Sequence, residues 1–286
     1  MNNPTVIVKA SAEVGEGPFW VPGDNLVHWV DIPPGKILTT DYTTGHTETF
    51  GYKEMIGAAV PRLGGGMLAA VESGFVGFDK NWGITHTLDL LGENYRMNDA
   101  KTDAAGRFWA GSNTIDFIPG EGSLWRLDEN WDATVVHTGL TLPNGIGWSP
   151  DNTAMYVVDS MQKILLKFPF DPTSSTIAGD PTLFAGPEAF DGLPDGLAMD
   201  TRGHIWIAEF GSAQLTEFSP DGTIVSRIAM PTQQPTSCAF VGPELDKLWV
   251  TSAAIGLDPA TDPDAGSIFE IAGMPARGIP VVPFAG

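Results

Sequence analysis

Four side chains with oxygen donors recur along the chain at places where they could form one site. They are Glu16, Asn98, Asn144 and Asp195. Carboxylate and amide oxygens are the ligands that hard divalent cations take in proteins. Two carboxylates also balance the charge of one dication, which favours binding in a channel of low dielectric constant. The residue types therefore predict a site for one divalent metal ion, provided that the fold brings the four positions together.

Each of these residues also has a plain structural interpretation. Asn144-Gly145 and Asp195-Gly196 are common turn dipeptides, and Glu16 between two glycines is typical of a solvent-exposed loop. Arg96, two residues before Asn98, is equally typical of a structural ion pair. The functional interpretation depends on whether the four positions are equivalent within a repeating unit.

Other catalytic patterns are missing from the sequence. There is no G-x-S-x-G, H-E-x-x-H or C-x-x-C motif and no glycine-rich phosphate-binding loop. The five histidines lie in different parts of the chain without the spacing of metal ligands: His28, His46, His86, His137 and His204. These observations argue against Ser-His-Asp catalysis and against a histidine-based zinc site.

The elements that must position the four donors are short strands, because helical periodicity is nearly absent. Six copies of one unit recur at intervals of about 40–50 residues, the spacing of propeller blades. Each copy has an apolar run, a polar turn and a second strand, and four of these second strands contain a tryptophan: Trp29, Trp109, Trp206 and Trp249. The turns fall at residues 22–25, 63–66, 103–106, 149–152, 200–203 and 242–246. The second strands are expected at 26–30, 67–71, 107–110, 154–158, 204–208 and 247–250.

The repeat predicts an all-β fold, a single six-bladed β-propeller of four-stranded antiparallel blades over residues 1–286. Residues 5–9 precede the first unit, and we expect them to form the outer strand that closes the ring against the last blade. A β-sandwich would also contain many strands, but it does not explain six copies of one pattern. In a propeller the first strand of every blade lines the central channel, so the four donors, each at the start of a unit, are expected to converge at one mouth.

The same segments carry a family resemblance. Residues 15–20 (GEGPFW), 96–99 (RMND), 142–145 (LPNG) and 193–196 (LPDG), with the segments that follow them, resemble those of the gluconolactonase, regucalcin and luciferin-regenerating enzyme family. The resemblance extends over nearly the whole chain, and the order and spacing of four motifs make it specific. The family is a six-bladed propeller with one divalent metal on its axis.

The resemblance also implies roles for single residues. Glu16, Asn144 and Asp195 fall on the metal-ligand positions of the family, and Asn98 and Arg96 fall on substrate-contact positions, with Asn98 also near the metal. Glu121 matches a further substrate contact. The chain departs from its relatives at residues 111–114 (GSNT) and in the following segment 115–121, where a loop could overhang the channel mouth.

The leading hypothesis is metal-dependent opening of a lactone ring, and Arg96 and Asn98 beside the metal favour a sugar lactone as substrate. Asp195 is the candidate for both ligand and general base, because a carboxylate bound to the metal is within reach of the attacking water. Ca²⁺, Mg²⁺, Mn²⁺ and Zn²⁺ are the candidate ions. Two alternatives stay open: a phosphotriesterase of the diisopropylfluorophosphatase type, and a non-catalytic propeller whose polar residues cap the channel.

The amino-acid composition limits the classes of molecule that the protein is expected to bind. With 15 basic and 35 acidic residues the formal net charge is −20, which disfavours nucleic acid and anionic lipid as partners. Cys238 is the only cysteine, so no internal disulfide can form. No signal peptide or long apolar segment is recognisable. We therefore expect a cytoplasmic protein that acts on a small molecule, monomeric or at most a weak homo-oligomer.

Overall fold

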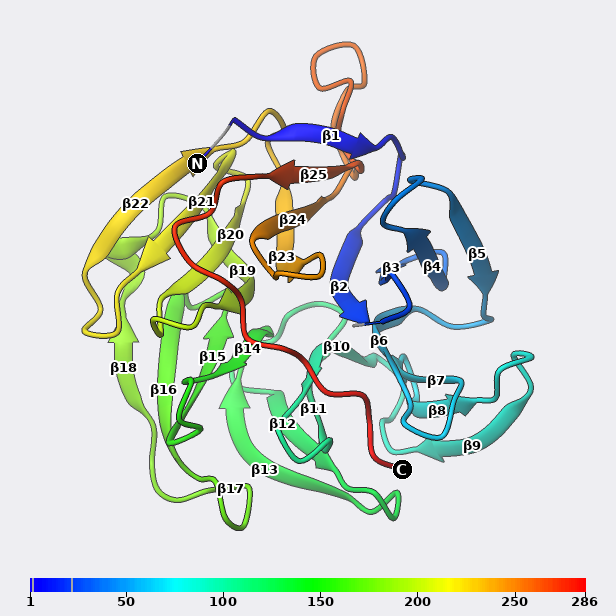
Figure 1. Ribbon diagram of the computed structural model, residues 1–286. Helices are drawn as coiled ribbons and strands as arrows, with labels where there is room; N and C mark the ends of the chain where they lie inside the picture. The colour runs from blue at the N-terminus through cyan, green and yellow to red at the C-terminus, as the bar shows by residue number, and fades with distance from the viewer. Residues whose placement is uncertain (2, 22) are drawn as a thin grey trace.

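Short strands and tight turns account for nearly all of the computed structural model, which describes residues 1, 3–21 and 23–286 (Figure 1). Six antiparallel sheets surround a central axis, which confirms the predicted six-bladed propeller. The described part of the chain contains no α-helix, only the 3-10 helix η1 (Pro187–Ala189). Within the same residues no helix has the length and apolar character required to cross a bilayer.

The strands of each blade follow one another from the axis outward. Blade 1 contains β2 (Gly15–Val21), β3 (Leu26–Asp31), β4 (Lys36–Asp41) and β5 (Thr47–Gly51), and blade 2 contains β6 (Ile56–Pro61), β7 (Met67–Val71), β8 (Gly74–Phe78) and β9 (Ile84–Asp89). Blade 3 contains β10 (Tyr95–Thr102), β11 (Phe108–Thr114), β12 (Gly122–Leu127) and β13 (Ala133–Leu140). Blade 4 contains β14 (Pro143–Trp148), β15 (Ala154–Asp159), β16 (Ile164–Asp171) and β18 (Thr182–Ala185), with the short β17 (Thr176–Ile177) also paired to β16. Blade 5 contains β19 (Leu193–Met199), β20 (Ile205–Phe210), β21 (Gln214–Phe218) and β22 (Ile224–Ala229), and blade 6 contains β23 (Pro235–Val241), β24 (Lys247–Ser252), β25 (Ile268–Ile271) and β1 (Thr5–Val8).

The ring is closed by the N-terminal strand, as the sequence predicts. β1 pairs antiparallel with β25, with Thr5 opposite Glu270 and Val6 opposite Phe269. The outer strand of the last blade therefore comes from the start of the chain. This arrangement ties the start of the chain and the last blade into one sheet and gives that blade its fourth strand.

The six turn–strand units have the predicted positions, with small differences at their boundaries. β7 matches its expected range, whereas β11 and β20 begin one residue later than expected. The amide N–H of Arg107 donates to Asp103 Oδ1, and that of His204 donates to Asp200 Oδ1. These two amides therefore complete the turns rather than the strand ladders. Pro22, in the first predicted turn, lies outside the described residues.

The tryptophan of the second strand anchors four blades. Trp29, Trp109, Trp206 and Trp249 are at most 2% exposed. Their indole N–H groups donate to a side chain of the same blade: Trp109 to Asp103 Oδ2 at 2.9 Å and Trp206 to Asp200 Oδ2 at 3.3 Å, for example. Burying the large ring stabilises the blade interfaces, and the hydrogen bond satisfies the one polar atom that is buried with it.

The last ten residues cross the face of the propeller (Figure 1, red). Gly278 N–H donates to the Leu245 carbonyl of blade 6, and Thr201 N–H of blade 5 donates to the Arg277 carbonyl. Further along, Phe284 N–H donates to the Pro61 carbonyl of blade 2 and the Phe284 side chain is fully buried. The segment thus connects blades on opposite sides of the axis, a feature that the repeat pattern did not predict.

Candidate active site

The predicted donors lie where the inner strands break their pairing register. β2, β10, β14 and β19 each have a register shift, and these shifts fall at or around Glu16, Asn98, Asn144 and Asp195. A β-bulge bends its strand and redirects a side chain, and bulges are common beside active sites. The four side chains lie at the same end of their strands and are only 4%, 4%, 6% and 8% exposed, respectively.

The structure brings three of them into one cluster on the axis. The carboxyl group of Asp195 lies within hydrogen-bonding reach of both the Glu16 carboxyl group and the Asn144 amide. Glu16 Oε2 accepts a hydrogen bond from Gly17 N–H at 2.7 Å, and Asn144 Nδ2 donates to Ser160 Oγ at 3.2 Å. Residues from blades 1, 4 and 5 therefore meet in one buried cluster.

Two oxygens in this cluster have no hydrogen-bond donor. Asn144 Oδ1 and Asp195 Oδ1 are buried and unpartnered. A buried acceptor without a partner costs about 1–3 kcal/mol, and here two such acceptors belong to side chains of the same cluster. One cation between them and Glu16 would satisfy both oxygens. The donor set, two carboxylates and one amide oxygen, is that of a hard divalent ion, so the residues present fit a metal ion.

The electrostatics of the cluster lead to the same conclusion. Burial raises the pKa of Glu16 well above its usual value, and the nearby carboxylates of Asp195 and Asp99 raise it further. Burial and Asp99 likewise raise the pKa of Asp195, against the lowering effects of hydrogen bonding and of Arg96. Carboxylates that repel one another in a desolvated site resist ionisation, and a bound cation is what would hold them ionised.

The predicted substrate-contact residues surround this cluster at different depths. Asn98 is buried, and its Nδ2 donates to the Pro143 carbonyl at 2.9 Å. Arg96 donates to the Met97 carbonyl at 3.1 Å; burial lowers its pKa to about 10, and Glu16 and Asp195 partly oppose this. Arg96 therefore remains a cation at neutral pH beside the carboxyl groups of Glu16 and Asp195.

Glu121 lies further out than the other predicted residues. It is exposed at the end of the 115–121 loop, and its Oε2 accepts a hydrogen bond from Tyr95 Oη at 3.0 Å. Tyr95 adjoins Arg96 on β10, so Glu121 lies on the same rim as the substrate-contact positions. Its role as a substrate contact stays a prediction.

Sequence reasoning overlooked two charged residues of the channel. Asp99, in the same bulge as Asn98, is buried; burial raises its pKa and Lys101 lowers it. The Lys101 ammonium donates to the Leu197 carbonyl at 2.7 Å. The sequence does contain a signal for them: Asn98, Asp99 and Lys101 place three polar residues close together on one inner strand, where apolar residues are expected.

A second group of potential metal ligands lies in blade 5, at its first turn and on β21. Asp200, His204 and Glu217 bring one ligand atom each within 4.8 Å of the others. The space between them is already taken by the Arg202 guanidinium, whose Nη2 is 2.6 Å from Asp200 Oδ2 and 3.0 Å from Glu217 Oε1. This cluster is an ion-pair network that braces the turn.

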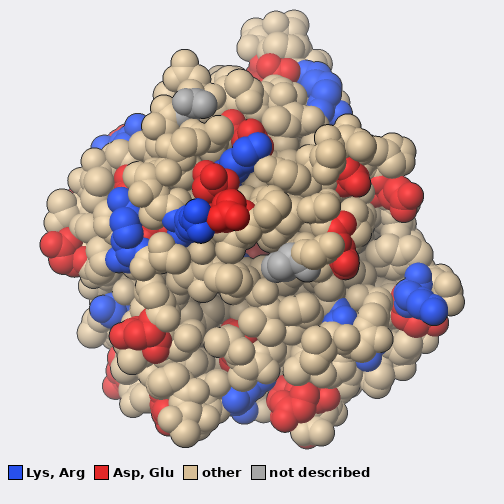
Figure 2. Space-filling view, in the orientation of Figure 1, with Lys and Arg blue, Asp and Glu red and all other residues tan. Residues whose placement is uncertain are grey.

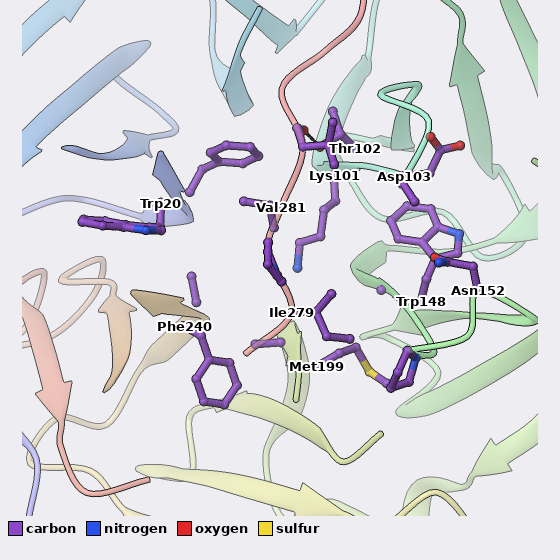
Figure 3. Close-up of a pocket in the computed structure, with 18 of the residues that line it drawn as sticks. Trp20, Lys101, Thr102, Asp103, Trp148, Asn152, Met199, Phe240, Ile279 and Val281 are labelled. Carbon is purple, nitrogen blue, oxygen red and sulfur yellow. Dashed lines mark hydrogen bonds between the residues drawn. The ribbon is translucent and has the colours of Figure 1, made fainter. Parts of the chain in front are cut away.

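The opposite mouth of the channel is apolar and contains none of the predicted site residues. A cavity of about 130 Å³ lies there under the C-terminal segment. Figure 3 shows Trp20, Trp148, Met199 and Phe240 around it, Ile279 and Val281 of the C-terminal segment across it, and the Lys101 ammonium pointing into its centre. On this face acidic and basic side chains lie close together and form no basic patch (Figure 2).

Comparisons with known proteins agree with this geometry. A family model described as the SMP-30/Gluconolactonase/LRE-like region matches residues 14–254. Regucalcin of Danio rerio is 31% identical over 291 residues, which cover 98% of this chain and 97% of the relative. The pentonolactonase XacC of Haloferax volcanii is 32% identical over 274 residues and covers 93% of each chain. A solved structure described as a calcium-binding protein, regucalcin from Agrobacterium tumefaciens, superposes with a TM-score of 0.93 at 26% identity, covering 98% of this chain and 97% of the other.

Proposed function

The chain belongs to the SMP-30/gluconolactonase/LRE-like family, and from this premise we propose that it is a metal-dependent lactonase that hydrolyses a sugar lactone. The observation that supports the proposal most strongly is the pair of buried, unpartnered oxygens of Asn144 and Asp195 facing Glu16. A pentonolactonase among the relatives supports the substrate class.

We assign Glu16, Asn144 and Asp195 as the residues that hold the ion. Their oxygen donors suit Ca²⁺, Mg²⁺ or Mn²⁺, with Zn²⁺ as a further candidate, and the calcium-binding description of the Agrobacterium relative favours Ca²⁺. When bound there, a divalent ion polarises the ester carbonyl and stabilises the negative charge that develops on it.

Asp195 is the candidate general base, because its free Oδ1 lies on the axis beside the other donors. In this scheme a water molecule attacks the lactone carbonyl carbon while Asp195 takes one of its protons. The ring C–O bond then breaks, and the proton passes to the departing ring oxygen, so that the product is a hydroxy acid. The net reaction consumes one water and leaves Asp195 as it began.

Arg96 and Asn98 would orient the substrate. Arg96 supplies a fixed positive charge beside the acidic cluster, and Asn98 has an amide oxygen in addition to the Nδ2 that is already engaged with Pro143. Donors and acceptors at such positions can bind the hydroxyl groups of a sugar ring and hold its ester beside Asp195. The binding would then also orient the reacting atoms.

A pH-stat assay tests the proposal. The protein is stripped with chelator, reloaded separately with Ca²⁺, Mg²⁺, Mn²⁺ and Zn²⁺, and supplied with aldonolactones of five- and six-membered rings and with a simple γ-lactone. We expect metal-dependent acid release from at least one sugar lactone and loss of that activity on chelation. Rates equal to spontaneous hydrolysis for every lactone and ion would refute it.

A further inference from the structure

One hydrogen bond inside the channel links two inner strands close to the acidic cluster. Lys101 lies on β10 of blade 3, and its ammonium donates to the Leu197 carbonyl on β19 of blade 5 at 2.7 Å. Blade 4 lies between these two blades in the ring. The bond therefore joins inner strands that do not neighbour each other in the ring.

The segment that receives this bond is the one from which Asp195 projects. β19 loses its pairing with β20 between Pro194 and Leu197, so Asp195 and Gly196 have no ladder partner. The segment is held by packing instead: a Cβ on Gly196 would lie 2.0 Å from Ser237 Oγ, and one on Gly145 would lie 2.5 Å from the Asp195 carbonyl oxygen. Lys101 fixes the carbonyl of the first residue after the bulge.

The charges around the Lys101 ammonium come from its own blade and from blade 1. Burial has the largest effect on the Lys101 pKa and lowers it, while Asp99 on its own strand and Glu16 of blade 1 raise it. The Cys238 thiol of blade 6 stays neutral, because burial raises its pKa to about 12. The ammonium also faces the cavity at the opposite mouth (Figure 3). It thus stands between the acidic cluster on one side and an apolar space on the other.

We propose that Lys101 is a positioning residue: by holding the Leu197 carbonyl across the channel it fixes the β19 bulge and thereby the direction of the Asp195 carboxylate. The claim that Lys101 fixes the β19 bulge requires neither a bound ion nor a substrate. Its catalytic consequence rests on the function proposed above, because it requires Asp195 to act as ligand and base.

Lys101→Met is the informative variant, because it keeps most of the side-chain volume and removes the charge and the N–H donors. Lys163→Met is the matched control. Lys163 also donates to a main-chain carbonyl, that of Asp191 at 3.3 Å, but in an exposed position, and its loss changes the net charge equally.

The first readout is hydrogen–deuterium exchange in the metal-free protein. In Lys101→Met we expect the peptide spanning residues 193–199 to exchange about tenfold faster than in the wild type, with the blade 2 peptides unchanged. Lys163→Met should match the wild type throughout. Unchanged exchange in 193–199, or an equal increase in every blade, would overturn the positioning role, the latter because it indicates general destabilisation.

The second readout is kinetic, at metal concentrations high enough to saturate each protein. Loss of a residue that orients a metal ligand typically costs 10–100-fold in activity or affinity, so we expect kcat to fall by about that factor while KM changes less than threefold. A kcat within threefold of the wild type would contradict the inference. If the wild type itself shows no lactonase activity, the proposed function fails, and the exchange experiment still decides the role of Lys101.

Should Lys101→Met fail to fold, Lys101→Arg replaces it. An arginine retains the charge and the donors, so exchange in 193–199 should stay within threefold of the wild type. Faster exchange confined to that segment despite the retained donors would count against the hydrogen bond as the cause.

Discussion

Replacing Asp195 with asparagine separates the chemistry of the site from its shape. The side chain keeps its size and its Oδ1, the atom that has no donor in the structure, but loses its charge and its ability to accept a proton. Proton transfer by a positioned base is worth about 10²–10⁴-fold in rate, or about 2.7–5.4 kcal/mol of activation free energy. We expect kcat of Asp195→Asn to fall by at least that factor on the best lactone.

The assay must keep metal loss apart from loss of the base. One of the two anionic ligands disappears in this variant, so the ion concentration is raised until the rate no longer increases, and occupancy is measured by elemental analysis after gel filtration. Asp191→Asn is the matched control: it removes the same charge from an exposed residue whose Oδ2 accepts a hydrogen bond from Gln214. Near wild-type kcat in a metal-loaded Asp195→Asn would show that Asp195 is not the base.

Three further outcomes follow from the structure. Removing the metal should lower the thermal midpoint by about 5–10 °C relative to protein at a hundredfold excess of ion over Kd; differential scanning fluorimetry with and without chelator measures this, and an unchanged midpoint would favour a non-catalytic propeller. In metal-free protein the raised pKa values of Glu16 and Asp195 mean that their contribution to stability is fully present below the ordinary carboxyl range near pH 4 and is lost as pH rises toward the raised folded values. Urea unfolding from pH 4 to pH 8 should therefore show a flatter loss of stability in Asp195→Asn than in the wild type, and parallel curves would contradict the burial argument. Phe284→Ala, which empties a fully buried site of the C-terminal segment, should cost about 3–5 kcal/mol in unfolding free energy and leave kcat unchanged, because that segment crosses the mouth opposite the acidic cluster. Leu63→Ala, at a side chain 72% exposed, should change neither the unfolding free energy nor kcat.

The sequence by itself determined the architecture and singled out Glu16, Asn144 and Asp195, but not Asp99. The turn recurs in every blade and the tryptophan in four of them, because all blades share the same short strand–turn–strand unit. Such local patterns can be recognised directly in a sequence. The equivalence of Glu16, Asn144 and Asp195 follows from the same repeat, since equivalent positions in a ring must face a common axis. The oxygen chemistry of the predicted site could be inferred from residue types alone.

Only the tertiary structure decided how that site is built. The bulges that redirect Asn98 and Asp195 depend on pairing with a second strand, and the unpartnered oxygens of Asn144 and Asp195 emerge only when every neighbour is in place. The bond from Lys101 to Leu197 joins blades that are not adjacent, so no repeat pattern could indicate it. Likewise, Arg202 pairs with both Asp200 and Glu217, whereas Asn144 Oδ1 and Asp195 Oδ1 have no partner among the described residues. Contacts across the axis join residues far apart in the chain, and their geometry is set by the closure of the ring.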